Sequence, residues 1–577
     1  MTPKQLMIGG KKSYDDFGLL IASRNISQPK KKSIKESVPF SNTIYDFSKI
    51  NGEIYWEERT LEYTFDIAEI TTEEMEKIKS KALDWFMNVH DDDIYDPYIG
   101  DYHFHGSFDS DSWNEDFGAG ELSISFTVYP YKISNSDVNV IEEIGVSDNG
   151  KIEYNNPTIN VLRIYGDSVQ NGAPTPSEPI EIQSVEFNEI NITGKNLFEI
   201  NNSSTNNGIT ITNNGDGTVT LNGTATMNTD LWVANGTSSK YKNIPIMKGV
   251  SVTQGVNEIS GSYTGDVTLR TLVNDGVTTY WGNIEKNKTY TPDINITLRA
   301  TEVLIQKGTT FNDWTIFPQL EIGKIATTPE QFHGETITLD DSISLHSLPD
   351  GTCDVYKNGV VTRKVGVFTF DGTQEPTSII VNSTTGNTTF IFNDNVVPSI
   401  DKIGLSNMYC NQLEVSTHFG YRNFENQIIK WNDTSASFCM GIDTSLVGET
   451  KESIMSYFQN NPLIVYYPLK EEVIETFDLP TISTYSPITN VSFDSNLSST
   501  FEVYYNDSKN ITINNNSSHR ITPTITSTGS FTIKLNNVSY SIGEGTYTSG
   551  LYLETGENKL TITGYGKITF SYSEEVF

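Results

Sequence analysis

The clearest sign of the fold is the stretch Leu122-Ser123-Ile124-Ser125-Phe126-Thr127-Val128. Apolar and small polar residues alternate along it, and this period of two is typical of a β-strand with one face in a core. The same alternation recurs much later in Phe531-Thr532-Ile533-Lys534-Leu535 and in Leu560-Thr561-Ile562-Thr563. Predicted strands and helices do not alternate regularly along the chain, which disfavours a parallel α/β fold. The chain is therefore predicted to be mainly β.

Turn residues separate such strands at short intervals. Residues 209–212 and 218–221 alternate in the same way, and Asn213-Asn214-Gly215-Asp216-Gly217 between them predicts a hairpin turn. Short strands spaced by Asn, Gly and Asp are typical of β-sandwiches and jelly rolls. We therefore expect several β-sandwich or jelly-roll modules.

One helix stands out from this background. Thr71 and Glu74 have the spacing of a capping box, and they precede a run with helical periodicity. The apolar positions of that run are Met75, Ile78, Ala82, Trp85, Phe86 and Val89. We expect this helix to pack on an N-terminal β domain, and a second, short helix over residues 451–459.

Composition limits the function classes. The chain has 577 residues, which at roughly 100–200 per domain predicts several domains. Its net charge of −34 makes nucleic acid and anionic membranes improbable partners. The three cysteines form no metal-binding or disulfide pattern, and neither a signal peptide nor a membrane-spanning stretch is evident. These features predict a protein that folds in a cytoplasm.

The first 135 residues resemble the N-terminal domain of siphophage distal tail proteins. The resemblance rests on Asp16-Phe17-Gly18-Leu19-Leu20-Ile21, Ser37-Val38-Pro39-Phe40-Ser41-Asn42, Trp56-Glu57-Glu58-Arg59-Thr60-Leu61 and Tyr129-Pro130-Tyr131-Lys132, in that order around the helix. In that family this domain forms a six-membered ring around the end of the tail tube. Residues 500–577, with Asn510-Ile511-Thr512-Ile513 and Ile521-Thr522-Pro523-Thr524, resemble the family's galectin-like C-terminal β-sandwich.

The long middle region departs from the short members of the family. Leu162-Arg163-Ile164-Tyr165-Gly166 and Leu345-His346-Ser347-Leu348-Pro349 resemble a receptor-interaction module of phages of Gram-positive bacteria. Residues 194–332 resemble a jelly-roll carbohydrate-binding module. The expected domains are thus 1–135, a discontinuous module of 158–193 plus 333–495, the jelly roll 194–332, and 500–577. Long members with such inserts bind host glycans.

Aromatic residues in the jelly-roll segment are the candidate sugar contacts. A sugar ring packs its apolar face on an aromatic ring while polar groups hold its hydroxyls. Trp232, Tyr241, Tyr280 and Trp281 lie in polar, turn-rich sequence and are the predicted carbohydrate-binding residues, although each is also consistent with a place in the core. Trp314 lies in an apolar stretch and is expected to be buried.

Two charged segments of the first domain are candidate inter-subunit contacts. Residues 91–116 are rich in Asp and are expected to form a loop, whereas Lys30, Lys31 and Lys32 form a basic run. In a ring, that run would meet Asp91, Asp92 and Asp93 of a neighbouring copy. A solvated loop and a solvated basic face, a Ca²⁺ site in the loop, and a transition-metal site at His103 and His105 are the alternatives. The EF-hand pattern is absent, so no metal site or cofactor is predicted.

Motifs of common enzyme classes are missing, and no catalytic residue is predicted. The resemblance implies a structural virion protein at the tail tip or baseplate, assembled in the bacterial host cytoplasm. It implies a homo-hexamer that contacts the tail tube protein and a tail-associated lysin or tail-tip fibre protein, and that binds cell-wall or capsular polysaccharide. A free-standing receptor-binding protein or adhesin and a polysaccharide-degrading tail enzyme are the alternatives.

Overall fold

A computed structural model describes most of the chain. The described residues are 3–49, 54–67, 71–116, 119–153, 158–235, 244–246, 248–274, 282–393, 396–397, 407–416, 425–430, 438–493, 495–497, 499–548 and 550–577. The chain forms two compact units, one made of Met1–Ile144 with Asp507–Phe577 and the other of Gly145–Asn506. This division is coarser than the four expected domains, whose boundaries stay a prediction.

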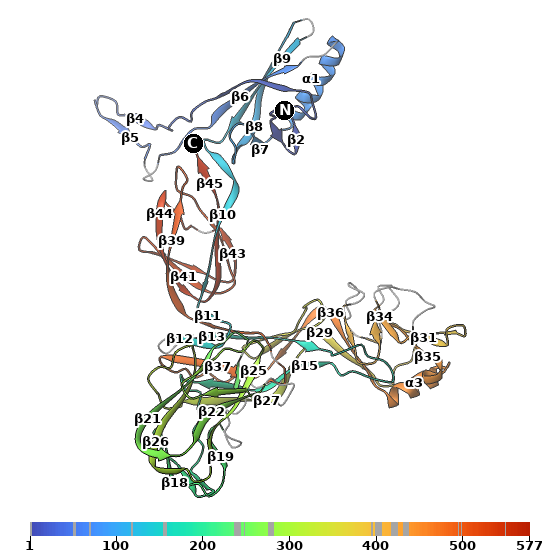
Figure 1. Ribbon diagram of the computed structural model, residues 1–577. Helices are drawn as coiled ribbons and strands as arrows, with labels where there is room; N and C mark the ends of the chain where they lie inside the picture. The colour runs from blue at the N-terminus through green and yellow to red at the C-terminus, as the bar shows by residue number, and fades with distance from the viewer. Residues whose placement is uncertain are drawn as a thin grey trace. The chain divides into compact units, whose positions relative to one another are not determined.

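The first unit is built on one long, branched sheet (Figure 1). Its strands are β1 (Met7–Ile8), β2 (Lys11–Lys12), β3 (Leu20–Ile26), β6 (Arg59–Ile67), β7 (Asp92–Tyr95), β8 (Tyr102–Asp116), β9 (Ala119–Val128), β10 (Lys132–Ile144), β40 (Thr524–Ser527), β43 (Gly545–Thr548) and β45 (Gly566–Val576). They pair in the order β2-β1-β7-β8-β10-β45-β40-β43, and β8 also leads through β9 and β6 to β3. Smaller sheets add β4 (Lys35–Ser37) with β5 (Ile44–Asp46), and β39 (Asp507–Asn515), β44 (Gly556–Gly564), β41 (Phe531–Leu535) and β42 (Val538–Ile542).

The alternation in residues 122–128 has the predicted effect. Leu122, Ile124, Phe126 and Val128 are buried in the core of the first unit, and they lie on β9. Polar residues between them face the other side, because successive side chains of a strand point to opposite faces. The polar segment after Tyr131 forms β10, which pairs along β45.

The predicted helix is α1 (Thr72–Met87), and it packs on this sheet as expected. The Thr71 hydroxyl accepts a hydrogen bond from the Glu74 N–H at 3.2 Å, which caps the helix. Glu74 accepts from the Thr71 hydroxyl at 2.8 Å, so the pair forms only one half of a capping box. Met75, Ala82, Trp85 and Phe86 are its buried residues.

The second unit consists of further β-sheets and two short helices within its described residues. One sheet runs β11 (Val146–Ser147), β38 (Phe501–Tyr505), β13 (Ile159–Tyr165), β28 (Val355–Lys357), β29 (Val360–Phe370), β36 (Leu463–Thr476) and β32 (Tyr409–Cys410). A second runs β12 (Lys151–Glu153), β37 (Ile488–Phe493), β15 (Gln183–Thr193) and β14 (Ser168–Val169), with β27 (Gly334–Leu345) on β15. A third runs β30 (Ser378–Asn382), β31 (Asn387–Phe392), β35 (Phe438–Asp443), β34 (Gln427–Lys430) and β33 (Glu414–Val415). The helices are α2 (Thr444–Val447) and α3 (Lys451–Asn460), the second of which was predicted.

Two more sheets of this unit hold the segment expected to be a jelly roll. One runs β16 (Ser204–Asn206), β17 (Ile209–Asn213), β18 (Val219–Thr224), β26 (Thr310–Ile322), β21 (Val252–Thr264) and β24 (Thr289–Tyr290). The other runs β19 (Thr229–Ala234), β25 (Ile296–Ile305), β22 (Val267–Asn274) and β23 (Gly282–Glu285), with β20 (Ile244–Ile246) on β25. The predicted hairpin is confirmed as β17 and β18, and Trp314 is buried as expected. The mainly β fold class is therefore confirmed. No helix among the described residues is long and apolar enough to cross a membrane.

Candidate interaction surfaces

A two-stranded ribbon extends the β3–β6 hairpin beyond the sheet of the first unit (Figure 1). We call it the arm and define it as residues 27–49 and 54–58. Its pairing continues outward through the Lys30 carbonyl, which accepts from the Glu57 N–H at 2.7 Å, and the Ile34 carbonyl, which accepts from the Phe47 N–H at 2.8 Å. Strands β4 and β5 form its outer part. The arm is thus a continuation of two strands that are anchored in the core.

The arm carries large apolar side chains that its own fold leaves uncovered. The exposed ones are Ile34, Val38, Phe40, Ile44, Tyr45, Phe47 and Tyr55. Phe40, at the turn between β4 and β5, is fully exposed (110 %) and has a φ of +65°, which is uncommon for a residue other than glycine. A ribbon of two strands is at best marginally stable alone, and exposed apolar patches mark interaction sites. The arm therefore has the properties of a docking element.

The basic run lies on the inner part of this arm. Lys30, Lys31 and Lys32 are exposed, and Lys31 places its Nζ 5.6 Å from the centre of the Trp56 ring. None of the three lysines forms an ion pair with a described residue. These cations are available to an acidic partner.

The acidic segment is a hairpin and not the expected loop. Asp92 and Asp93 lie on β7, which pairs with β8, and β8 pairs along most of its length with β9. A buried face accounts for these strands, because Phe104 on β8 and Ile94 on β7 lie in the core while Asp93, next to Ile94, is exposed. The acidic hairpin (residues 91–116) therefore exposes Asp91, Asp93, Asp109 and Asp111, whereas Asp96 is buried.

Histidines organise the carboxylates of this hairpin. His105 Nδ1 lies 2.7 Å from Asp93 Oδ1, and His105 Nε2 lies 3.1 Å from Asp91 Oδ1. His103 Nε2 lies 3.3 Å from the same Asp93 oxygen. Both ring nitrogens of His105 can donate only when the imidazole is protonated. Within the described residues, no three His, Cys, Asp or Glu side chains are arranged to hold a metal ion.

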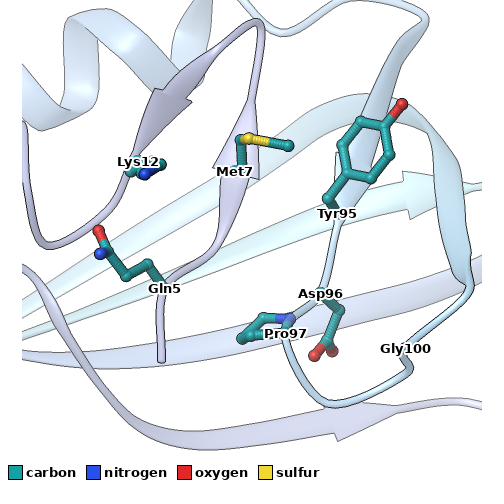
Figure 2. A pocket seen from close by; sticks show the side chains of 7 residues that line it. All are labelled: Gln5, Met7, Lys12, Tyr95, Asp96, Pro97 and Gly100. Atoms are coloured by element: carbon teal, nitrogen blue, oxygen red, sulfur yellow. The ribbon is translucent and has the colours of Figure 1, made fainter. Parts of the chain in front are cut away.

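A pocket of about 280 Å³ opens at the end of β7 (Figure 2). Its lining is Gln5, Met7, Lys12, Tyr95, Asp96, Pro97 and Gly100. Asp96 is buried, and its carboxylate already accepts hydrogen bonds from Arg24 Nη1 at 2.6 Å, the Tyr63 hydroxyl at 2.6 Å and the Tyr98 N–H at 2.8 Å. The pKa of Tyr63 is raised by burial, by the charge of Asp96 and by the hydrogen bond that the Tyr63 hydroxyl donates to Asp96. Asp96, the one carboxylate that lines the pocket, thus already has its hydrogen-bond partners within the protein.

Of the predicted sugar contacts, only Trp232 lies in the described part of the chain. Tyr241, Tyr280 and Trp281 lie outside the described residues. Trp232 is on β19 and is 42 % exposed. On the same face, its partner across the β19–β25 pair is Glu302, whose partner across the β25–β22 pair is Arg270. Arg270 Nη2 lies 2.6 Å from Glu302 Oε1.

This row of an aromatic ring, a carboxylate and a guanidinium is chemically suited to a sugar. The ring offers a flat apolar surface, and the ion pair holds polar atoms in a fixed position beside it. Sequence reasoning identified Trp232 but missed Arg270 and Glu302. Their distance along the chain gives no local signal, since only strand register brings them together. It also missed the apolar side chains of the arm, because their exposure depends on the tertiary structure.

The chain matches no family model and no curated protein sequence. Among solved structures, it is similar to the Dit protein of phage SPP1, described as a paradigm of the hub adsorption apparatus in phages that infect Gram-positive bacteria. That likeness has 10 % identity and a TM-score of 0.21 and covers 55 % of this chain and 99 % of the other. The phage P2 baseplate in its activated conformation with Ca is similar at 10 % identity and a TM-score of 0.17, over 56 % of this chain and 99 % of the other. Such low TM-scores establish neither fold nor function for this chain.

Proposed function

We propose that the chain is a non-enzymatic structural protein of a phage tail tip or baseplate. Copies of its first unit associate into a ring, six in number as the N-terminal sequence resemblance implies. That ring joins the tail tube protein to a lysin or fibre protein of the tail tip, and the protein resides in the virion after assembly in the host cytoplasm. The second unit binds cell-wall or capsular saccharide.

The observation that carries the ring is the arm. It combines uncovered apolar side chains with three lysines that form no ion pair with the described residues, and the same unit presents an acidic hairpin. A contact between two different surfaces of identical copies is heterologous, and such contacts close into rings when the rotation allows. Negative-stain imaging of the purified full chain tests this directly. Sixfold rings are expected, whereas monomers or stalk-like trimers would favour the free-standing adhesin.

Charge reversal of the basic run is expected to weaken assembly. In the variant Lys30→Glu, Lys31→Glu, Lys32→Glu, the arm would repel the acidic hairpin of the next copy, and self-association should fall about tenfold or more near 0.1 M salt. Sedimentation velocity at several salt concentrations measures the change. Glutamates at Lys307, Lys324 and Lys470, which are exposed in the second unit, alter the net charge equally and serve as the control.

A charge swap makes this test more specific. Adding Asp91→Lys, Asp92→Lys and Asp93→Lys to the reversed arm restores opposite charges across the contact and should recover assembly. The swap removes the contacts of His105 with Asp91 and Asp93, so circular dichroism must first show that the swapped chain has a native spectrum. Unchanged assembly of the reversed arm alone would refute the lysine contact.

Trp232 is expected to contribute to saccharide binding. Trp232→Ala removes the platform without touching the core, and binding of the full chain to purified host cell-wall polysaccharide should fall about tenfold, in line with the loss of a stacked aromatic contact. Tyr547→Ala, at an exposed aromatic residue of the first unit, is the matched control. Undiminished binding would show that Trp232 is no contact. Release of oligosaccharide in the same incubation would favour the degrading enzyme.

A further inference from the structure

Two features of the first unit have no specific partner in the contacts described so far. Phe40 is a fully exposed aromatic ring at the tip of the arm. The pocket at the end of β7 is a hollow whose only carboxylate is already satisfied. We infer, resting on the proposed ring, that Phe40 of one copy inserts into this pocket of a second copy of the chain.

The arm is long enough to make the contact intermolecular. Fourteen positions separate Ile26, the last residue of β3, from Phe40, and at about 3.3 Å per residue an extended ribbon of that length reaches about 45 Å. The pocket, by contrast, is formed by β1, β2 and the turn after β7, within the body of the unit. Because the paired ribbon leads away from that body, its tip meets the pocket of another copy and not its own (Figure 1).

The pocket suits an aromatic ring in size and in chemistry. Apolar cavities of about 150 Å³ accept a benzene molecule, and this open pocket has about 280 Å³. Met7, Tyr95 and Pro97 supply apolar surface around it (Figure 2). Since Arg24, Tyr63 and the Tyr98 N–H already satisfy Asp96, the pocket does not require a polar ligand. A phenyl group gains burial there without taking a hydrogen-bond partner from Asp96.

Charge supports a second copy as the occupant. Four of the pocket residues belong to the acidic hairpin, where Asp93 lies two positions before Tyr95 and Asp101 directly follows Gly100. The arm carries Lys35 five positions before Phe40, which is about 16 Å along a strand, and the basic run lies further back. An arm that places Phe40 in the pocket thus brings its lysines toward carboxylates, which favours this docking direction.

The contact also suits a ring. Phe40 and the pocket are different surfaces of one chain, so each copy uses its arm on one neighbour and its pocket on the other. Every copy then inserts its Phe40 into one neighbour and receives Phe40 from the other. A closed ring therefore leaves no arm uncovered. Central aromatic anchors of this kind dominate the energy of protein interfaces.

The first experiment compares Phe40→Ala with Phe40→Trp in the full chain by sedimentation velocity. Phe40→Ala should weaken self-association about 100-fold, as expected for a hot-spot residue. Phe40→Trp keeps an aromatic anchor and should retain most of it. Val38→Ala, at a neighbouring exposed residue of the arm, is the control and should have a smaller effect. Because Phe40 is fully exposed, none of these variants should change the melting temperature of the unassembled chain.

The second experiment locates the partner site by cross-linking. A Phe40→Cys, Met7→Cys chain, made in a Cys353→Ser background because that thiol is only partly buried, should form covalent oligomers on mild oxidation. The Phe40→Cys, Asp341→Cys chain should form no 40–341 link, because Asp341 belongs to the second unit and does not line the pocket. Covalent oligomers that carry the 40–7 link support the insertion.

The outcomes separate this inference from the proposed function. A wild-type chain that stays monomeric at all concentrations overturns the ring and the insertion together. A wild-type chain that assembles, with Phe40→Ala assembling equally well and no 40–7 cross-link, overturns the insertion alone. Loss of assembly in Phe40→Ala with a cross-link to position 7 supports both.

Discussion

Replacing Asp354 by asparagine should destabilise the second unit by about 3 kcal/mol, as breaking a buried charge cluster does. Asp354 is fully buried, and its Oδ2 accepts from the His346 N–H at 3.0 Å, His346 Nδ1 at 3.0 Å and Arg363 Nη1 at 3.1 Å. Its Oδ1 accepts from the Lys364 N–H at 2.9 Å and the Val365 N–H at 3.0 Å. An asparagine would turn its NH₂ group toward some of these donors and leave the Arg363 charge without one partner. Calorimetry of the full chain measures the loss.

The matched control for this variant is Asp341→Asn. Asp341 lies exposed on β27 in the same unit, so its replacement should change the unfolding free energy by no more than about 0.5 kcal/mol. Equal stabilities of the two variants would show that the Asp354 cluster does not hold these strands together.

The stability that Asp354 adds to the second unit should also depend on pH, and it should fall in acid. Burial alone would raise the pKa of Asp354, but hydrogen bonds from the His346 side chain and from the N–H groups of His346, Val365 and Lys364 outweigh it and lower the pKa. A lowered pKa in the folded state adds stability above the unfolded value, which is about 3.9 for aspartate. That stability is lost as pH falls through the folded value. The difference between wild type and Asp354→Asn should therefore be full near neutral pH and shrink in strong acid.

Replacing Phe86 by alanine should destabilise the first unit by about 3–5 kcal/mol, the usual cost of emptying a buried phenyl site. The Phe86 side chain is fully buried between helix α1 and the sheet. Its ring centre lies 5.7 Å from that of Phe65 and 5.9 Å from that of Phe126, so the cavity would border two other large side chains. Alanine is a good helix former, which leaves the lost packing as the main effect.

The next residue supplies the control. Met87 is 59 % exposed on the same helix, so Met87→Ala should cost less than about 1 kcal/mol. Urea unfolding followed by tryptophan fluorescence compares the two, because Trp85 lies against Phe86 with its ring centre 4.5 Å away. Similar losses for both variants would contradict the predicted packing of the helix.

The helix and the strands were predictable because their signals are local. The spacing of Met75, Ala82, Trp85 and Phe86 reflects the turn of a helix, and the alternation around Phe126 reflects the pleat of a strand. The same reasoning failed for residues 91–116. A dense set of aspartates resembles a loop, but Phe104 and strand pairing outweigh that bias once β9 supplies hydrogen bonds.

The candidate sites were less predictable, because they depend on residues far apart in sequence. Trp232 was identifiable as an aromatic residue in a polar setting, but Glu302 and Arg270 join it only through the register of β19, β25 and β22. The pocket likewise joins residues near position 7 with residues near position 96. Exposure of Phe40 is also a tertiary property, since the same aromatic residue in a core strand would be buried.

By itself, the sequence determined the mainly β class, the capped helix on the first unit and the strong net negative charge, because periodicity, capping and charge are set by neighbouring residues. Tertiary structure alone decided which strands pair, where the arm leaves the sheet, and that Asp354, Asp96 and Asp93 each have different partners. Those outcomes depend on strand register and on burial, which follow from contacts between distant segments that no local pattern encodes.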